Sequence, residues 1–461
     1  MKSAFLLEKG RVIDGTGAVP FTADVLVEDD KIAAVGADAQ ARTRHLQHAT
    51  RIDASGMTVM PGLIDAHCHL SFDDAGSNPE IFHQRRNALS ALVATYNARK
   101  LLRAGVTGVL DPDSVHECMI DVRDAIEAGL FEGPRIVAGC YALISGVGGT
   151  AGRLINDTGV TGYYKVVSGK DEILAEVRRQ VKVGADWIKV HVSGFAPRYA
   201  HLGERCSWMQ EELDLICEIA HDLGVPVMGH CRGDVATYRA AKAGVDLIFH
   251  GTGMSARTLE AVIDRKIPVC PAFTFQANMA EYGGRLGSDP NLMKLLEREI
   301  VDSSESMQQL RRAGVPLLTG SEAGFSIVPY GEWHHRELEV FVRYYGMSGL
   351  EAIHCATGAG AFALKMVGQT GVVAPGMKAD LICVTGDPSE DVGILGRDGS
   401  IRHVFVDGVA MDLAPPRERK PLSGWRLPTM GGTLSRAVAF GDGTSKHPAV
   451  AAGGVGDIGD H

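Results

Sequence analysis

The stretch Met60-Pro61-Gly62-Leu63-Ile64-Asp65-Ala66-His67-Cys68-His69-Leu70 decides how the rest of the chain is interpreted. An apolar strand leads into it from Met57 and ends in a His-x-His pair. Because side chains two residues apart on a strand share a face, His67 and His69 point to the same side. Two neutral imidazoles side by side at a strand end can hold one metal ion. The same pattern also occurs by chance, so a metal site requires further ligands elsewhere in the chain.

A repeat of amphipathic helix, glycine and apolar strand follows this stretch, from about residue 60 to residue 365. Glycine is the usual residue after a helix because it adopts the left-handed conformation freely. Together with the opening strand, the pattern predicts eight strands, at 58–66, 107–110, 134–138, 187–192, 226–228, 246–249, 269–271 and 316–318. Eight such units favour a (β/α)8 TIM barrel with its active site at the carboxyl ends of the strands. An open doubly wound sheet is the alternative, but its Gly-x-Gly-x-x-Gly turn is absent after the first strand.

The two ends of the chain have a different pattern from the barrel segment. Residues 1–58 and 367–413 contain short apolar runs between turn residues, which are typical of β structure. We expect them to form one β-sandwich, built from both chain ends, beside a barrel over residues 59–366. Residues 414–461 are rich in Gly, Pro, Ser and charge, and we expect an extended, partly disordered tail.

Composition narrows the classes of partner. The net charge is −10 and no run of Lys or Arg stands out, so we expect neither a nucleic-acid nor a membrane partner. No apolar run reaches the roughly 20 residues that span a bilayer, and the N-terminus does not resemble a signal peptide. The nine cysteines are scattered without a CxxC pair, which indicates reduced thiols in the cytoplasm. We expect a small-molecule substrate and a homo-oligomer.

A lysine in the middle of an apolar strand is the second unusual feature. In the strand at 187–192, alternation directs Lys189 and His191 inward and their apolar neighbours outward. A lone ammonium inside a barrel is costly to desolvate and shifts toward the neutral amine. A neutral lysine can take up CO₂ to become a carbamate, whose two oxygens can bridge two cations. The alternative is a lysine paired with an acidic neighbour.

Two further histidines end neighbouring apolar strands. His230 ends the strand at 226–228 and His250 ends the strand at 246–249. Either one alone could be a hydrogen-bonded core residue. Together with Lys189 on the preceding strand and the first-strand pair, they indicate a metal site with an open position for water.

These residues resemble the amidohydrolase superfamily of metal-dependent hydrolases, over about residues 1 to 413. The resemblance is carried by the ligand-type residues above, by Leu63-Ile64-Asp65-Ala66-His67, and by Gly371-Val372-Val373-Ala374-Pro375-Gly376-Met377-Lys378-Ala379-Asp380-Leu381. Within the superfamily, the chain looks most like the Xaa-Pro/Xaa-Arg dipeptidase and imidazolonepropionase-like branch, and Lys189 favours the type with a carbamylated lysine.

The resemblance implies a barrel with a flanking β-sandwich and two divalent cations. One cation would be held by His67 and His69, the other by His230 and His250, with carbamylated Lys189 between them. Zinc is the first expectation, and Mn, Co or Fe are alternatives because such ligands accept all of them.

The chain departs from the family pattern at two places. Gly320-Ser321-Glu322-Ala323-Gly324 stands where relatives carry Gly-Thr-Asp-Ala-Gly, so Glu322 is the acid placed to contact the metal and take the proton from water. Its side chain is one methylene longer, which leaves open whether it is a ligand or a base outside the coordination sphere. Gly148-Gly149-Thr150 stands where many relatives have Gly-Gly-His, so a dipeptide substrate does not follow.

The leading interpretation is hydrolysis of a C–N bond in an amide, peptide, urea or carbamate, with Glu322, Lys189 and His230 in the catalytic centre. A deaminase or cyclic-amide hydrolase on the same barrel is the alternative, as are a lactonase or esterase activity and a non-catalytic barrel used for assembly. Weaker predictions concern side chains expected to fill the barrel, to hydrogen-bond at its mouth or to line the pocket, namely His191, Asp111, Tyr163, Tyr164, Arg198, His334 and His335.

Overall fold

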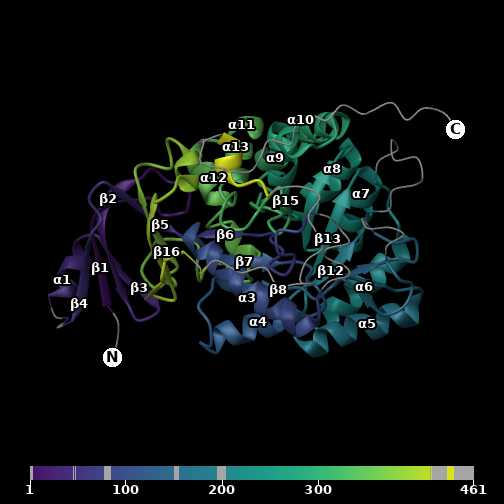
Figure 1. Cartoon of the computed structure of the whole chain (residues 1–461), viewed down its shortest axis with the longest axis horizontal. Coiled ribbons are helices and arrows are strands. Elements are labelled where there is room, and N and C mark those ends of the chain that lie inside the picture. The colour runs from purple at the N-terminus through teal and green to yellow at the C-terminus, as the bar shows by residue number, and fades with distance from the viewer. Residues whose placement is uncertain are drawn as a thin grey trace.

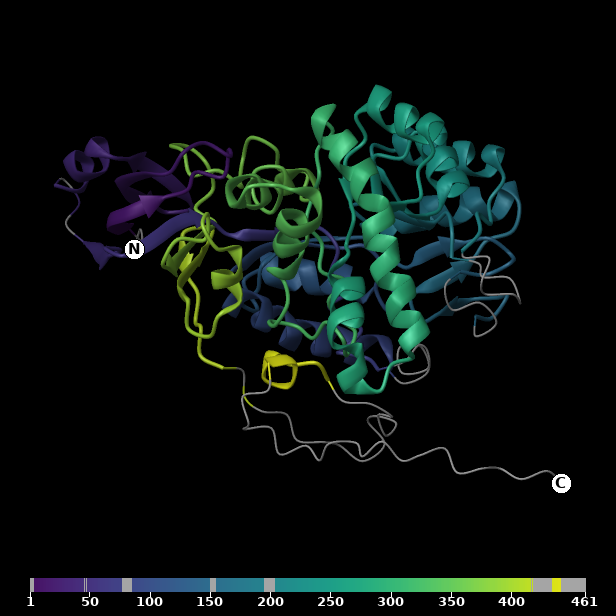
Figure 2. The ribbon, with the colours of Figure 1, turned by 90° about the horizontal axis from the view of Figure 1, so that it is seen from above.

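The computed structural model describes residues 4–44, 46, 48–76, 85–149, 155–194, 204–415, 417 and 433–440. Two regions lie next to each other along the long axis of the molecule (Figures 1 and 2). One is a mostly antiparallel sheet and the other consists of parallel strands surrounded by helices. In the described part of the chain, no helix combines the length and apolar character needed to cross a membrane.

The first region is an eight-stranded sheet formed by both chain ends, at the left of Figure 1. Its strands are β1 (Ala4–Val12), β2 (Phe21–Glu28), β3 (Lys31–Val35), β4 (Ala49–Asp53), β5 (Met57–Pro61), β16 (Leu381–Thr385), β17 (Ile401–Val406) and β18 (Val409–Ala410). Their order is β18-β17-β16-β5-β1-β2-β3, with β4 paired to β1. β5 joins the two groups because it pairs with β1 on one side and with β16 on the other. Both chain ends therefore contribute strands to one region, as the sequence indicated, but the strands form one hydrogen-bonded sheet where a β-sandwich was expected.

The single strand predicted over 58–66 is in fact two strands that belong to different sheets. β5 lies in the flanking sheet, whereas β6 (Leu63–Asp65) pairs in parallel with β7 (Val106–Asp111). Gly62 separates them, and a Cβ atom at this position would lie 2.6 Å from the Cβ of Thr107. Only glycine allows two backbones to approach so closely. The stretch that carries the His-x-His pair is thus the junction between the two regions.

The parallel strands of the second region form two sheets. One contains β6, β7 and β8 (Arg135–Ala138), and the other has the order β10-β11-β9-β12-β13-β14-β15. The latter strands are β9 (Ala142–Ile144), β10 (Val160–Thr161), β11 (Tyr164–Val166), β12 (Ile188–His191), β13 (Val227–Arg232), β14 (Leu247–Thr252) and β15 (Val269–Cys270). The strands β12 to β15 are buried almost throughout, as expected for parallel strands with helices on their outer face.

Helices alternate with these strands and cover their outer side (Figures 1 and 2). They are α3 (Asn87–Arg103), α4 (Cys118–Glu127), α5 (Lys170–Val183), α6 (Gln210–Asp222), α7 (Asp234–Ala243), α8 (Ala256–Arg265), α9 (Thr274–Tyr282), α10 (Pro290–Arg312) and α11 (Arg336–Tyr345). Glycines follow these helices as the sequence predicted. Gly184 and Gly244, for example, end α5 and α7 in the left-handed conformation. The alternating α/β architecture predicted from the sequence is therefore confirmed.

Among the described residues, the regular strand ladders do not close into one continuous barrel. Scattered hydrogen bonds connect neighbouring segments instead, among them Asp186 N to Ala138 O (2.8 Å) and Ala66 N to Thr319 O (2.8 Å). The strand predicted at 316–318 makes only an isolated bridge to β15, through Val269. Its first residue is a proline, which has no N–H to donate to a ladder.

Shorter elements complete the fold. β10 and β11 lie between β9 and α5, and α12 (Gly349–Cys355) and η4 (Gly360–Phe362) follow α11. Within the expected tail, residues 433–440 pack against the parallel-strand region and include α13 (Arg436–Phe440). Leu434 is fully buried there and donates from its backbone N–H to Ser326 O at 2.8 Å.

Candidate active site

A cavity of about 170 Å³ lies at the carboxyl ends of the parallel strands. The side chains around it come from loops or strand ends that are distant in the sequence but adjacent in the fold. They are His67, His69, Phe72, Asp113, Tyr163, Tyr164, Lys189, His191, Glu204, His230, Arg232, Phe275, Glu322 and Phe325. Of the six predicted ligand-type residues, five line this cavity, and His250 contacts two of the five from beneath.

The carboxylate of Glu322 lies where three imidazoles converge. Its oxygens are 3.3 Å from His69 Nε2, 3.4 Å from His250 Nε2 and 3.7 Å from His67 Nε2. The longer side chain therefore reaches the centre of the histidine cluster in this structure. Burial opposes ionisation of Glu322, but the neighbouring His67 and His69 rings lower its pKa below the usual value for a glutamate. The acid is an ionised carboxylate in the middle of the ligand-type residues.

Backbone geometry holds Glu322 and the first histidine together. The Glu322 N–H donates to His67 O at 2.8 Å, which fixes the last strand segment against the first. Glu322 has φ +58° and His250 has φ +67°, a region that non-glycine residues seldom occupy. Such backbone conformations cluster at functional sites, because the surrounding structure must hold them in place.

His230 and His250 face each other through one nitrogen of each ring. His230 Nδ1 lies 3.0 Å from His250 Nε2, and Glu322 Oε1 lies 3.4 Å from the same His250 nitrogen. The opposite nitrogens are already engaged, because His230 Nε2 contacts Glu204 Oε2 at 3.0 Å and His250 Nδ1 contacts Pro271 O at 3.2 Å. Both engaged nitrogens face acceptors, which favours the tautomers with the ring proton at these positions. In these tautomers two lone pairs face each other, an arrangement that calls for a cation or a shared proton between them.

Lys189 lies among these groups without a hydrogen-bond partner for its amine. Its Nζ is buried, makes no hydrogen bond within the described residues, and lies 4.1 Å from the centre of the Phe249 ring. Burial lowers the pKa of Lys189 below its usual value, and nearby Asp113 and Glu322 oppose this only in part. The acidic neighbour considered from the sequence does exist, but the Asp113 carboxylate is 3.9 Å away. This distance is too long for a hydrogen bond, so the amine stays unsatisfied.

Asp113 and Glu204 are the functional candidates that the sequence analysis missed. Asp113 Oδ1 lies 2.9 Å from His69 Nδ1, and Glu204 Oε2 lies 3.0 Å from His230 Nε2. Each carboxylate thus fixes one imidazole in the tautomer whose other nitrogen faces the cluster, a contact typical of metal-binding histidines. Asp113 follows the strand end at Asp111 by two residues, which was a usable signal, whereas no local pattern distinguishes Glu204.

The protonation of the histidines follows from their burial and partners. Burial lowers the pKa of His67 and His250 well below the usual histidine value, so both rings are neutral. His69 is the exception, because Asp113 and Glu322 outweigh burial and raise its pKa to about 10. Neutral imidazole is the form that binds metal, and His69 would release its extra proton when a cation arrives.

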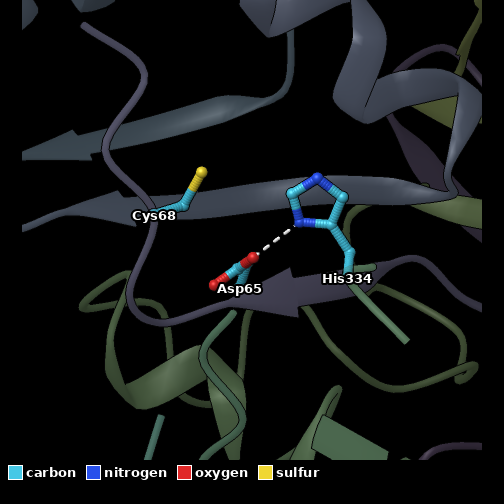
Figure 3. A group of neighbouring side chains, drawn as sticks. All are labelled: Asp65, Cys68 and His334. Carbon is cyan, nitrogen blue, oxygen red and sulfur yellow. Dashed lines mark hydrogen bonds and ion pairs between the residues drawn. The ribbon is translucent and has the colours of Figure 1, made fainter. Parts of the chain in front are cut away.

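A second group of ligand-type residues, Asp65, Cys68 and His334, lies near the end of β6 (Figure 3). His334 Nδ1 donates to Asp65 Oδ2 at 2.8 Å, and His334 Nε2 accepts from the Gly331 N–H at 3.1 Å. The other Asp65 oxygen accepts from the backbone N–H groups of His67 and Ser321. All polar atoms of Asp65 and His334 are therefore paired, and the pair connects the first and last strand segments.

The weaker predictions are distributed around the cavity. His191, expected to fill the barrel, lines the cavity, lies 2.8 Å from Asp113 Oδ2 and stacks on His230. Tyr163 and Tyr164 line the cavity as well, whereas His334 and His335 are buried away from it. Asp111 accepts from Leu70 N at 2.8 Å, as expected for a hydrogen-bonding role at the barrel mouth. Arg198 lies outside the described residues.

Comparison with known proteins identifies the class. The model of the amidohydrolase family matches residues 58–411. Ochratoxinase from Aspergillus niger is 27% identical over 430 residues, which cover 87% of this chain and 85% of that protein. Imidazolonepropionase from Ralstonia nicotianae is 25% identical over 400 residues, which cover 80% of this chain and 87% of that protein.

A solved structure supports the same family assignment. The crystal structure of a Xaa-Pro dipeptidase with methionine bound in its active site superposes with a TM-score of 0.75 at 27% identity, and the match covers 89% of this chain and 100% of that one. The chain belongs to the amidohydrolase family and is a hydrolase of carbon–nitrogen bonds. The resemblance noted in the sequence is thereby confirmed, and the described residues include groups able to hold a metal ion.

Proposed function

We propose that the chain hydrolyses an amide, peptide, urea or carbamate bond of a small molecule at a two-cation centre inside a closed (β/α)8 barrel. His67 and His69 would hold one cation, His230 and His250 the other, and a carbamylated Lys189 would lie between them. The amidohydrolase family and the similar Xaa-Pro dipeptidase support a substrate bond of this kind. Zinc is the expected metal, with Mn, Co or Fe as alternatives.

The observation that carries this proposal is the pair of facing ring nitrogens of His230 and His250, 3.0 Å apart. Their other nitrogens contact Glu204 and Pro271, so in the tautomers that these contacts favour the two facing nitrogens both carry lone pairs and neither can donate to the other. The buried, unsatisfied amine of Lys189 is an independent sign that a group absent from the polypeptide completes the site. The donor set of imidazole and carboxylate suits a catalytic zinc-type centre.

Lys189 fits carbamate formation because burial lowers the pKa of its amine, which favours the neutral form, and because the amine has no competing hydrogen bond. Its Nζ would form a bond to the carbon of CO₂ and release one proton, which gives an anionic carbamate with two oxygens. The chain thereby gains a bridging ligand at the point where its own side chains supply none.

Glu322 is the proposed proton carrier of the reaction. When bound, the cations would polarise the scissile carbonyl and lower the pKa of a water molecule toward neutrality. Glu322 lies ionised among the imidazoles, so it can accept the proton of the attacking water. It would then return this proton to the leaving nitrogen, as a general base that becomes a general acid. Asp113 and Glu204 would keep the rings of His69 and His230 in their ligand tautomers.

Metal analysis combined with a substrate panel tests the proposal. We expect two equivalents of metal per chain, hydrolysis of at least one compound among N-acyl amino acids, dipeptides, anilides and carbamates, and a mass increase of one CO₂ under gentle ionisation. A chain that hydrolyses such a compound with one metal and an unmodified Lys189 would contradict the bridged centre. It would favour the single-metal deaminase or cyclic-amide type instead.

The remaining proposals concern the cellular location, the oligomeric state and the partners of the enzyme. We propose a cytoplasmic homo-oligomer that acts on a small molecule and has no nucleic-acid or membrane partner. Nine free cysteines and a net charge of −10 support this setting. Size-exclusion chromatography with light scattering, which measures the mass of the assembly, tests the oligomer, and a monomeric mass would contradict it.

A further inference from the structure

Aromatic rings form one wall of the active-site cavity. Phe72, Tyr163, Phe275 and Phe325 all line it, and they come from four separate segments of the fold. Phe325 makes edge-on contacts with Phe72 at 5.4 Å and with Phe275 at 5.5 Å between ring centres. Tyr163 lies 4.6 Å from Phe72. The four rings are thus connected in a row, from Tyr163 through Phe72 and Phe325 to Phe275, and we call them the aromatic wall.

The rings of the aromatic wall differ in burial and therefore in role. Phe72 is almost fully buried and stacks parallel to His69 at 4.3 Å, so it supports that imidazole. Phe275 and Phe325 are only half-buried and line the cavity, so they retain apolar surface that can be covered. Half-buried rings in a cavity are a typical binding surface for a ligand, because covering them removes apolar area from water.

Polar side chains line the cavity as well, and Arg232 is one of them. Its guanidinium lies 3.8 Å from Glu204 and 3.6 Å from Glu299. Two carboxylates therefore lie near this cation before any ligand binds, so the arginine does not require an anionic ligand. Besides the Lys189 amine, which we assign to the cation site, the half-buried rings are the surface left for a ligand to cover.

The size of the cavity limits what can lie against the wall. Its volume is about 170 Å³, and an apolar protein cavity of about 150 Å³ is known to accept benzene. The space therefore suits one ring of this size next to the scissile group. Two rings or a long aliphatic chain would extend beyond it.

We propose that the aromatic wall is a specificity site for one ring-sized apolar group attached directly or through one carbon to the scissile amide, urea or carbamate. This inference rests on the proposed hydrolase function and adds the substrate class to it. The half-buried Phe325 and Phe275 are the residues that select the ring.

Substrates matched in their reacting groups test the selection. N-phenylacetyl-glycine carries a ring on the acyl side, N-acetyl-phenylglycine carries one on the amine side, and N-acetyl-glycine has none. We expect kcat/KM of the metal-loaded enzyme to be about ten- to a hundredfold higher for at least one ring-bearing compound, the ratio expected from burying one ring. Equal values for all three compounds would overturn the inference.

Single substitutions locate the effect. Phe325→Leu is expected to reduce the ring preference about three- to tenfold through loss of ring–ring contact. Phe275→Leu serves as the second variant if the first folds poorly. Phe131→Leu is the matched control, because Phe131 is an exposed phenylalanine after α4 and does not line the cavity. An unchanged preference in both wall variants would contradict the assignment.

Ligand binding separates this inference from the proposed function. Isothermal titration with benzylphosphonate and methylphosphonate compares the ring-bearing and ring-free forms of one ligand without requiring turnover. We expect benzylphosphonate to bind about tenfold more tightly in the wild-type enzyme, and less so in Phe325→Leu. If no C–N bond is cleaved but this preference remains, the hydrolysis proposal fails and the ring site stands. If both phosphonates bind equally, the ring site is refuted.

Discussion

Two clusters of ligand-type side chains include residues at or just after the end of β6, and their hydrogen bonding differs. In the first, His67, His69, Glu322 and their neighbours leave the Lys189 amine unsatisfied and two imidazole nitrogens facing each other. In the second, shown in Figure 3, the side-chain polar atoms of Asp65 and His334 are all paired within the protein.

Both clusters are close enough to hold an ion when only the spacing of their atoms is considered. The difference between them shows that close spacing of ligand atoms is not sufficient to identify a metal centre. Buried polar groups are normally satisfied, so an unsatisfied group indicates a missing partner. We therefore assign the cations to the first cluster and a positioning role to the second. The predictions below test this division, from the largest expected effect to the smallest.

Replacing Lys189 with Ala should have the largest effect. Without the amine there is no carbamate to bridge the cations, so we expect bound metal and activity to be lost together. Inductively coupled plasma analysis of the dialysed variant and a rate assay measure both quantities. Full activity in this variant would show that the lysine does not bridge.

Replacing Glu322 with Gln should affect the rate more than the metal. The amide keeps the size of the side chain but cannot accept the proton of water at neutral pH. We expect kcat to fall about 10²- to 10⁴-fold, the usual contribution of a general base. Metal content measured in parallel should be retained, and loss of one cation would instead make Glu322 mainly a ligand.

Replacing Asp113 with Ala should weaken cation binding without abolishing it. Asp113 contacts His69 Nδ1 at 2.9 Å, and loss of such an outer carboxylate typically costs about 10- to 100-fold in metal affinity. Competition with a metal chelator measures the change. Asp113→Asn keeps an acceptor for the ring N–H and should restore most of the affinity; if it does not, the carboxylate itself is a ligand.

Replacing His334 with Ala should lower stability but not metal content. The change leaves Asp65 Oδ2 and the Gly331 N–H without partners in a buried location, which costs about 1–3 kcal/mol per unpaired group. Urea unfolding measures the loss. His221→Ala is the matched control, because this half-exposed histidine pairs with Asp246 at the surface, where such a contact contributes at most about 1 kcal/mol.

Replacing Cys68 with Ala should have the smallest effect. The thiol is fully buried, and burial raises its pKa well above the usual value, so it is not a thiolate ready to bind metal. We expect a stability loss of about 1 kcal/mol from the lost sulfur contacts and an unchanged number of cations per chain. If one cation per chain disappears, the second cluster is a metal site and the comparison above is wrong.

Part of the candidate site and much of the fold could be anticipated from residue patterns. Period-two alternation placed His67 with His69 and directed Lys189 inward, because strand geometry is local. The helix–glycine–strand repeat indicated the α/β architecture for the same reason. Asp113 and Glu204 could not be found in this way, since their partners lie 44 and 26 residues away and only the fold brings them together.

The sequence by itself determined the alternation of helices and strands, the β unit formed by both chain ends and the identity of the ligand-type residues. These features depend on spacing along the chain, which propensity and periodicity report. Only the tertiary structure decided that β5 and β6 are separate strands, that Glu322 reaches the histidine cluster, and that an aromatic wall faces it. Each of these depends on contacts between segments distant in sequence, whose geometry is set by packing and not by local pattern.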